Sequence, residues 1–503
     1  MAADARKNPA AVAWLLAISL SLCSPFQLFA ELQPASDAPL SLKQALEVLQ
    51  GKNYYGNYAK GRKLGWDLEE FSLDTLNGES VAKLVTQSHT ISLFDKTKSE
   101  TRTKNTTWFS LEGQGLIVRA EAEHRENGDW KKRILRRDKG KYYLETLTQA
   151  GENTRPVLAP KETFALHRDF YSWLNQPRKK GDVIHSFSLS LEEDDFDVPS
   201  ETRFMEKVVE KGSELVFLVE VQTHGAVLHA RLKKDGKMIQ GTVGRLFDTR
   251  LEPEKKALDM SFPPVDMLDV SAVTLDTKLG DPSRVSFLSL RPKPQIERII
   301  PESTRQKWVK NPDGQYHLEI RREPAKGVEV VALKQGEKTR YLESTRSMPT
   351  DDPKIQELAE KITRDAKSPG EKARAVLTWV YKNLDKTLSK NADSAKEVLE
   401  AKAGDCTEHT LLFVALARAG GIPSREVGGI AYLFDLEETP RMGWHAWAEF
   451  HDGSRWVTAD PTWNQICVDA THIKFSEGPA DLKWINLLGG LKFQVLDFKK
   501  EKE

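Results

Sequence analysis

Residues 404–409 read Gly-Asp-Cys-Thr-Glu-His, and this stretch decides how the second half of the chain folds. Asp405 and Glu408 have the spacing of a capping box, in which an N-cap side chain and the residue three positions later bind each other's backbone amides. An apolar run from 411 to 417 follows, and a pair of glycines then supplies the expected stop. The pattern predicts a buried helix that begins at Cys406.

A cysteine in the first turn of a helix has a distinctive electrostatic environment. Free backbone N–H groups and the positive end of the helix dipole surround it, and both lower a thiol pKa and favour the nucleophilic thiolate. The neighbouring carboxylate of Asp405 has the opposite effect, because a negative charge raises a thiol pKa. The sequence leaves open which effect on Cys406 is larger.

A predicted hairpin carries the partners that such a thiol needs. Residues 444–450 alternate as a strand, with His445 on one face. The Asp-Gly pair at 452–453 is a strong signal for a two-residue turn, and 455–460 reads as the returning strand. A hairpin centred on that pair places His445 directly opposite Asp460, with Cβ atoms roughly 5 Å apart. A nucleophile, a base and a carboxylate that orients the base are what covalent acyl chemistry requires.

The sequences GDCTEH, WHAWAEF and ADPTW together resemble the transglutaminase-like superfamily in its bacterial form. The similarity covers about residues 346–475, and it implies a papain-like α+β domain. It also implies that Cys406 is the nucleophile, His445 the base and Asp460 the orienting carboxylate. Each residue alone has an ordinary structural explanation, such as a buried inert thiol, but the three in register favour the triad.

Two tryptophans share the predicted face of His445. Trp447 and Trp456 are therefore candidates for the wall of a hydrophobic acyl-binding slot, although aromatic residues on a half-buried hairpin more often belong to the core. The resemblance further implies that the backbone N–H of Cys406 contributes to an oxyanion hole.

A metal site is the alternative explanation for the same residues. His409 could join the three triad residues as a zinc ligand, but a Cys-x-x-His spacing is unusual for structural zinc and the triad already uses three of the four. We expect no metal and no cofactor, since the sequence contains no phosphate loop, dinucleotide fingerprint or calcium loop. Cys467 is expected to be a buried thiol, with a reversible bridge to Cys406 as the alternative.

Composition excludes some partners. The 503 residues include 74 Lys plus Arg and 74 Asp plus Glu, so the balance of charge favours no polyanionic partner and we expect no nucleic-acid binding. We expect a protein or peptide substrate, while the oligomeric state stays open.

The N-terminus resembles an export signal. Two basic residues precede an uncharged run from 8 to 30, which predicts a signal peptide over residues 1–30 and an exported, periplasmic or secreted protein. An uncleaved membrane anchor is the main alternative, and lipidation at Cys23 is another. Cleavage leaves two cysteines, which is no disulfide framework.

Three further segments follow the signal. Residues 31–258 predict a β-rich antiparallel domain with turns such as Asn127-Gly128, and it is expected either to shield or position the catalytic part or to bind a substrate or lipid in a groove. Residues 259–345 predict a connecting β region, either a small unit or part of the first sheet. Residues 346–503 predict the catalytic domain, α+β in class, with helices before strands.

The predicted function is therefore cysteine-dependent acyl chemistry on peptide or amide bonds. Hydrolysis by a peptidase or amidase is favoured over transfer to an amine, because water wins by default against dilute amines unless the site excludes it. A protein-glutamine transglutaminase and a non-catalytic binding or scaffold protein of the cell envelope are the alternatives.

Overall fold

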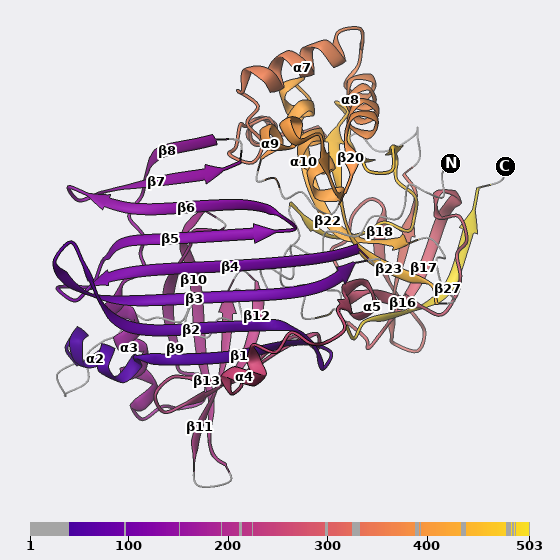
Figure 1. Cartoon of the computed structure of the whole chain (residues 1–503). Helices are drawn as coiled ribbons and strands as arrows, with labels where there is room; N and C mark the ends of the chain where they lie inside the picture. Colours follow the sequence, from indigo (N-terminus) through magenta and orange to yellow (C-terminus); the bar gives the residue numbers. More distant parts are fainter. Residues whose placement is uncertain are drawn as a thin grey trace.

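The fold is described from a computed structural model of the chain (Figure 1). The structure describes residues 40–94, 97–149, 151–192, 194–210, 214–223, 225–296, 300–323, 332–387, 392, 394–433, 439–478, 484, 487 and 489–501. The predicted signal peptide and most of a short helix predicted over 482–488 lie outside these residues. No helix of the described residues combines the length and the apolar content that a membrane span requires.

The N-terminal half forms a large curved sheet. Its strands are β1 (Gly51–Ala59), β2 (Arg62–Leu76), β3 (Glu79–Phe94), β4 (Thr97–Ser110), β5 (Ile117–Glu126), β6 (Asp129–Asp138), β7 (Lys141–Thr148), β8 (Gly151–Val157), β9 (Val183–Ser190), β10 (Asp195–Val209), β11 (Leu215–Thr223), β12 (Ala226–Lys233), β13 (Met238–Val243), β14 (Phe247–Leu251) and β15 (Val265–Asp266). The order is β8-β7-β6-β5-β4-β3-β2-β1-β14-β13-β12-β11-β10-β9, antiparallel throughout, and β15 adds a short parallel pair to β3.

Local turn chemistry explains why neighbouring strands pair in sequence order. The turn at Asn127-Gly128 has positive φ at both residues, 48° and 97°, as do those at Lys60-Gly61, Asn77-Gly78 and Lys139-Gly140. Tight hairpins of this kind match the twist of the strands that they join, and glycine accepts the conformation most easily. The predicted β-rich antiparallel region is thus confirmed.

Two helices fill the interior of this sheet, α2 (Leu42–Leu49) and α3 (Phe164–Asn175). Their buried faces belong to one apolar core, which also includes residues of β1–β8 and of β9–β14, the two halves of the strand order. Arg133 on β6 donates to the carbonyl of Leu191 at the β9–β10 turn. This bond connects strands near the two opposite ends of the strand order. The interior also holds two carboxyls on β2, where burial raises the pKa of Asp67 to about 7 and of Glu69 to about 8.

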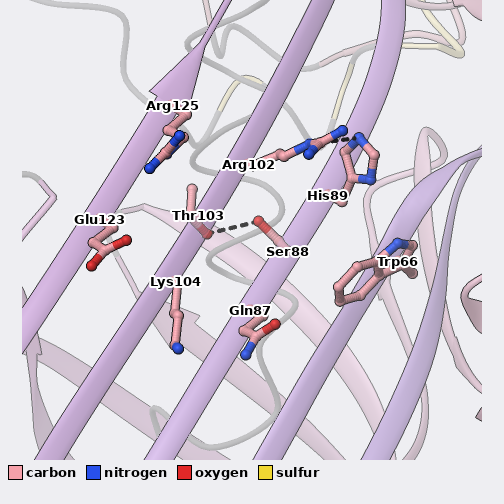
Figure 2. A pocket seen from close by; sticks show the side chains of 9 residues that line it. All are labelled: Trp66, Gln87, Ser88, His89, Arg102, Thr103, Lys104, Glu123 and Arg125. Carbon is pink, nitrogen blue, oxygen red and sulfur yellow. Dashed lines mark hydrogen bonds between the residues drawn. The ribbon is translucent and has the colours of Figure 1, made fainter. Parts of the chain in front are cut away.

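The opposite face of β2–β5 carries a pocket of about 370 Å³. Figure 2 shows its lining, which consists of Trp66, Gln87, Ser88, His89, Arg102, Thr103, Lys104, Glu123 and Arg125. The Ser88 and Thr103 hydroxyls bond at 2.8 Å, and Arg102 donates to His89 at 3.3 Å.

The C-terminal half forms a second sheet. Its strands are β16 (Val273–Leu275), β17 (Val285–Lys293), β18 (Gln306–Lys310), β19 (Tyr316–Arg321), β22 (Ser424–Leu433), β23 (Arg441–His451), β24 (Trp456–Asp460), β25 (Gln465–Ile466), β26 (Ile473–Glu477) and β27 (Lys492–Lys500). The order is β18-β19-β17-β27-β16-β23-β22-β26, with β24 on β23 and β25 on β24.

This topology corrects the predicted domain boundaries. Apart from β15, which pairs with β3, the segment 259–345 is neither a unit of its own nor part of the first sheet, because β16–β19 hydrogen-bond into the same sheet as the predicted catalytic strands. The last strand, β27, lies between β16 and β17. In addition, one apolar core runs from the first sheet into the second and includes Phe94, Val265 and Met442. The predicted catalytic domain is therefore not complete from residue 346.

Helices cover part of the second sheet. They are α7 (Pro353–Thr363), α8 (Pro369–Asn383), α9 (Ala395–Ala401) and α10 (Cys406–Ala419), and they pack against one another and against β23 and β24 (Figure 1). α8 begins as predicted, with Ser368 as N-cap, Pro369 at the first position and Glu371 completing a capping box. The other short elements are α4 (Glu254–Ala257), α5 (Met267–Ser271), η2 (Pro282–Arg284), α6 (Gln335–Arg340), β20 (Asp385–Lys386) and β21 (Ala403–Gly404). The α+β class is confirmed.

Candidate active site

The start of α10 is built as the sequence predicts. Asp405 accepts a hydrogen bond from the Thr407 amide at 2.5 Å, and Glu408 accepts one from the Asp405 amide at 2.8 Å. Glu408 folds back closely over position 404. A Cβ on residue 404 would lie 2.3 Å from the Cβ of Glu408, which explains why residue 404 is a glycine. Cys406 is thereby fixed in the first helical turn.

Cys406 is completely buried, and its surroundings show which effects on the thiol pKa are larger. Burial, followed by the charge of Asp405, raises the pKa of the Cys406 thiol well above its ordinary value. Burial likewise raises the pKa of Glu408 well above its usual range. The backbone N–H of Ala446 hydrogen-bonds to the Cys406 sulfur and acts in the opposite direction, but more weakly. Burial and the neighbouring carboxylate therefore both favour the protonated thiol in this closed arrangement.

That hydrogen bond places the sulfur beside β23. In the described chain, β16 pairs with one edge of β23 at Arg441 and Met442, and β24 pairs with it from Ala448 onward. Between these two stretches the edge of β23 is open, and Ala446 directs its N–H toward the sulfur there. Because the nitrogen of Ala446 is bonded to the carbonyl carbon of His445, the sulfur lies against the peptide that carries the predicted base.

The hairpin register differs from the prediction by two residues. His451 pairs with Trp456 and Ala448 with Ala459, so the loop spans four residues, 452–455, instead of two. Asp452 explains the wider loop, because its carboxylate accepts the amides of the two residues at 454 and 455. The direct opposition of His445 and Asp460 is therefore wrong. A shift of two keeps each side chain on its face, since side chains alternate with period two.

The predicted base and carboxylate still meet, as diagonal rather than directly opposed neighbours. His445 Nε2 lies 2.9 Å from Asp460 Oδ2, and both side chains are buried. Asp460 Oδ1 accepts the backbone amides of Thr462 at 2.8 Å and Trp463 at 3.1 Å. Burial alone would raise the pKa of Asp460, but His445 and a second histidine, His472, outweigh it and hold the pKa below its usual range. Asp460 is therefore ionised and aimed at the imidazole.

The structure brings a residue to the site that the sequence reasoning missed. His472 Nε2 lies 3.3 Å from the same oxygen of Asp460, and its Nδ1 lies 3.3 Å from Asp469. It is fully buried. A histidine just before a short strand gave no motif to follow, so only the fold could place it here.

The tryptophans are arranged differently from the prediction. Trp463, which the sequence analysis did not select, stacks on the ring of His445 at 4.0 Å between centroids and 11° between planes. Trp447 also touches that ring, at 6.1 Å, but it is completely buried. Trp456 lies four residues from Asp460, where it packs on Tyr341 at 4.9 Å. It is not placed to line the triad.

Trp447 has its position because of a glycine on the next strand. A Cβ on Gly429 of β22 would lie 2.6 Å from the Trp447 indole and 2.1 Å from the Ile473 carbonyl oxygen. Only a residue without a side chain allows the indole to cross β22 and reach His472, with 5.3 Å between ring centroids.

The zinc alternative finds little support in the geometry. His409 donates through Nδ1 to the Asp405 carbonyl at 2.6 Å, and burial lowers the pKa of His409 to about 4. Among the described residues, the one group of three potential ligands is His445, Asp460 and His472. Both imidazoles approach the same oxygen of Asp460, and neither Cys406 nor His409 belongs to this group.

Cys467 is a free, half-buried thiol, and Cys406 is free as well. Burial and Glu323 raise the pKa of Cys467. The charged groups that act on Cys406 are different ones, so the two thiols occupy separate surroundings.

Comparisons with known proteins agree with this geometry. Residues 356–461 match the sequence model of the transglutaminase-like superfamily, which confirms the resemblance and shows that the chain contains a transglutaminase-like domain. An uncharacterised protein of Haemophilus influenzae is 30% identical over 132 residues, 25% of this chain and 34% of that protein. The kyphoscoliosis peptidase of Mus musculus is 24% identical over 144 residues, 27% of this chain and 22% of that protein. The chain spans about a third or less of the length of these relatives.

Two solved structures share parts of the fold. One is a candidate cysteine protease from Cytophaga hutchinsonii, 18% identical with a TM-score of 0.27, for which the match covers 43% of this chain and 88% of that one. The other is a candidate protease from Parabacteroides distasonis, 13% identical with a TM-score of 0.17 over 69% of both chains.

Proposed function

We propose that the chain is a cysteine-dependent enzyme that attacks peptide or amide carbonyls through Cys406. The observation that carries the proposal is the 2.9 Å contact between His445 and Asp460, next to a cysteine whose sulfur is hydrogen-bonded to the adjoining amide of Ala446. The match to the transglutaminase-like superfamily supports the same chemistry.

The geometry supports a mechanism in which the thiol is activated during attack. Burial and Asp405 favour the protonated thiol at rest, so in this mechanism His445 takes that proton through Nδ1 as the sulfur bonds to the carbonyl carbon. Asp460 stabilises the imidazolium through Nε2. The imidazolium then protonates the leaving amine, the carbon–nitrogen bond breaks, and an acyl-cysteine remains until a second nucleophile attacks it.

Water as that second nucleophile is the favoured outcome, which makes the protein a peptidase or amidase. A mammalian relative in the comparisons carries the name of a peptidase, and this supports hydrolysis. The N-terminal segment supports action on peptides outside the cytoplasm, with a periplasmic or secreted location.

Transfer to an amine is the second candidate, and one observation favours it. Cys406, His445 and Asp460 are 0, 2 and 0% exposed, and Trp463 covers one face of the imidazole. A site that excludes water in this way can let an amine compete with water at 55 M.

One experiment separates the two. The mature protein is incubated with cell-envelope peptides and a labelled primary amine at low millimolar concentration, and free acid is measured against amine adduct. Cys406→Ala is the control, and it must abolish both products. Free acid in excess supports the hydrolase, whereas a dominant adduct would establish a transglutaminase instead.

A further inference from the structure

The carboxylate of Asp460 is shared by two imidazoles. His445 and His472 both approach Oδ2, at 2.9 Å and 3.3 Å, while Oδ1 accepts the amides of Thr462 and Trp463. A carboxylate offers about four acceptor sites, and here all of them are used. The orientation of Asp460 is therefore fixed by two histidines and two backbone amides. The proposed triad includes only one of these partners, His445.

The second imidazole lies between two acids. His472 Nδ1 lies 3.3 Å from Asp469 Oδ1, so each ring nitrogen has its own carboxylate. An imidazole can donate to both only when both nitrogens carry a proton. Burial alone would lower the pKa of His472, but Asp469 and Asp460 outweigh it and raise the pKa. The two flanking carboxylates thus favour the charged form of His472 beside the carboxylate that serves His445.

Asp469 is itself held in place. It accepts the amide of Thr471 at 3.0 Å and the hydroxyl of the same residue at 2.5 Å. The buried guanidinium of Arg305 donates to the carbonyl of Asp469 at 2.8 Å and brings a positive charge next to it. This second acid is therefore part of a rigid arrangement.

The other charged and titratable groups that act on this arrangement come from several elements. On β23 they are His445 and, farther along, Glu449, which is paired with Lys474 of β26 at 3.0 Å. Groups that interact electrostatically with Asp460 are Cys406 and His409 on α10 and Lys386 on β20. Apart from Asp469, the direct contacts of His472 are Asp460 and the rings of His445, Trp447 and Trp463.

We propose that His472 is a positioning residue, which aims Asp460 at His445 and places a fixed positive charge 5.7 Å from the His445 ring. The inference rests on the proposed function. Both His472 and Asp469 lie outside the stretch 356–461 that matches the superfamily, so the family match does not assign them. The cation offsets part of the attraction of Asp460 for imidazolium. It thereby makes imidazolium a better acid toward the leaving amine, and its removal should raise the pKa of the groups around it.

Two nearly isosteric variants separate position from charge. His472→Gln places an amide nitrogen where Nε2 stands, so it keeps the donor to Asp460 and loses the charge. His472→Asn places its amide nitrogen where Nδ1 stands, so it keeps the Asp469 contact and loses the one to Asp460. Asp469→Asn is a third variant that leaves His472 without its second acid. A purely structural role predicts that the losses in all three simply follow melting temperature.

The measurement is the rate at which iodoacetamide alkylates Cys406 in the full chain, as a function of pH, with peptides resolved by mass spectrometry. Removing a cation raises the pKa of its neighbours. In His472→Gln the midpoint pH of Cys406 alkylation should therefore rise by about one pH unit. Below the midpoint this variant should react about tenfold more slowly. His472→Asn should be slower by a further factor of about 10 to 100, because Asp460 is no longer held.

Cys467 in the same sample is the internal reference. If Cys406→Ala still turns over peptide substrate, the proposed function fails, whatever the His472 variants do. If that variant is inactive and folded His472→Gln and His472→Asn both keep the alkylation rate and midpoint of Cys406, the inference about His472 is wrong and the proposed function stands. Equal loss in both variants, in step with melting temperature, also overturns the inference.

Discussion

The replacement Asp460→Asn tests the proposed triad at a contact whose geometry is known. An amide can keep its oxygen toward the amides of Thr462 and Trp463, which occupy Oδ1 in the present structure. Its NH₂ group then faces His445 Nε2 and His472 Nε2, where two N–H donors now meet an acceptor. Flipping the amide moves the same conflict to the backbone amides. Nε2 of His445 must therefore become an acceptor, which puts the ring proton on Nδ1 and removes the base.

The expected loss can be worked from the contact. Two unit charges 2.9 Å apart attract by roughly 5 to 6 kcal/mol at an effective dielectric constant of about 20. Losing about 5 kcal/mol of that stabilisation slows the reaction by about 10⁴-fold, which is also the cost of Asp-to-Asn replacement in a serine protease triad. Unfolding free energy should fall by only about 1 to 3 kcal/mol, because His472 can lose its proton together with the carboxylate charge.

Turnover and melting temperature of Asp460→Asn measured in parallel provide the assay. Asp460→Glu is the control, since it keeps the charge and changes only the reach of the side chain. Above about pH 5 the folded protein benefits from the ionised Asp460, whose pKa lies below that in the unfolded chain. That stability is lost as the pH falls, so the Asn variant should have a flatter acid limb of stability. A fully folded Asn variant with less than a tenfold loss of rate would refute the orienting role.

Three further perturbations address the surroundings of the site. Gly429→Ala should cost several kcal/mol because its Cβ would meet the Ile473 carbonyl at 2.1 Å, whereas Gly370→Ala in α8, with nothing within 4 Å, should be neutral; equal melting temperatures would contradict this. The pKa of Asp67 is about 7 in the folded protein and about 3.9 in the unfolded chain. The free energy of unfolding should therefore fall by up to ~1.4 kcal/mol per pH unit as the pH rises from 4 to 7. Asp67→Asn should flatten that slope in urea titrations. A fragment starting near Thr345 should be insoluble because it lacks β16–β19, whereas a fragment starting near residue 261 keeps these strands. If the shorter fragment is soluble and its thiol is reactive, β16–β19 are dispensable.

Local signals in the sequence were sufficient for much of the site. The capping box around Cys406, the capped start of α8 and the Asn127-Gly128 turn all depend on a few neighbouring residues, and the structure confirms each of them. The meeting of His445 with Asp460 also survived, although for a less specific reason. An error of two residues in the register does not change the face of a strand.

Long-range features could not be read in the same way. His472 and Trp463 reach His445 only because β26 pairs with β22 and the chain turns back after Asp460, and no local pattern encodes that pairing. The placement of β16–β19 in the second sheet is another such feature. Two short strands and a proline-rich connection read alike whether they form a separate unit or the edge of a distant sheet.

The most direct test of the central claim is capture of the acyl group on Cys406. The protein is mixed with cell-envelope peptides, quenched in acid within seconds and digested, and the mass of the peptide that contains Cys406 is measured by mass spectrometry. The mechanism predicts an added mass equal to the acyl part of the substrate on Cys406, absent from Cys467 and from the Cys406→Ala variant, which should also be inactive. Substrate turnover that continues in Cys406→Ala would contradict the mechanism.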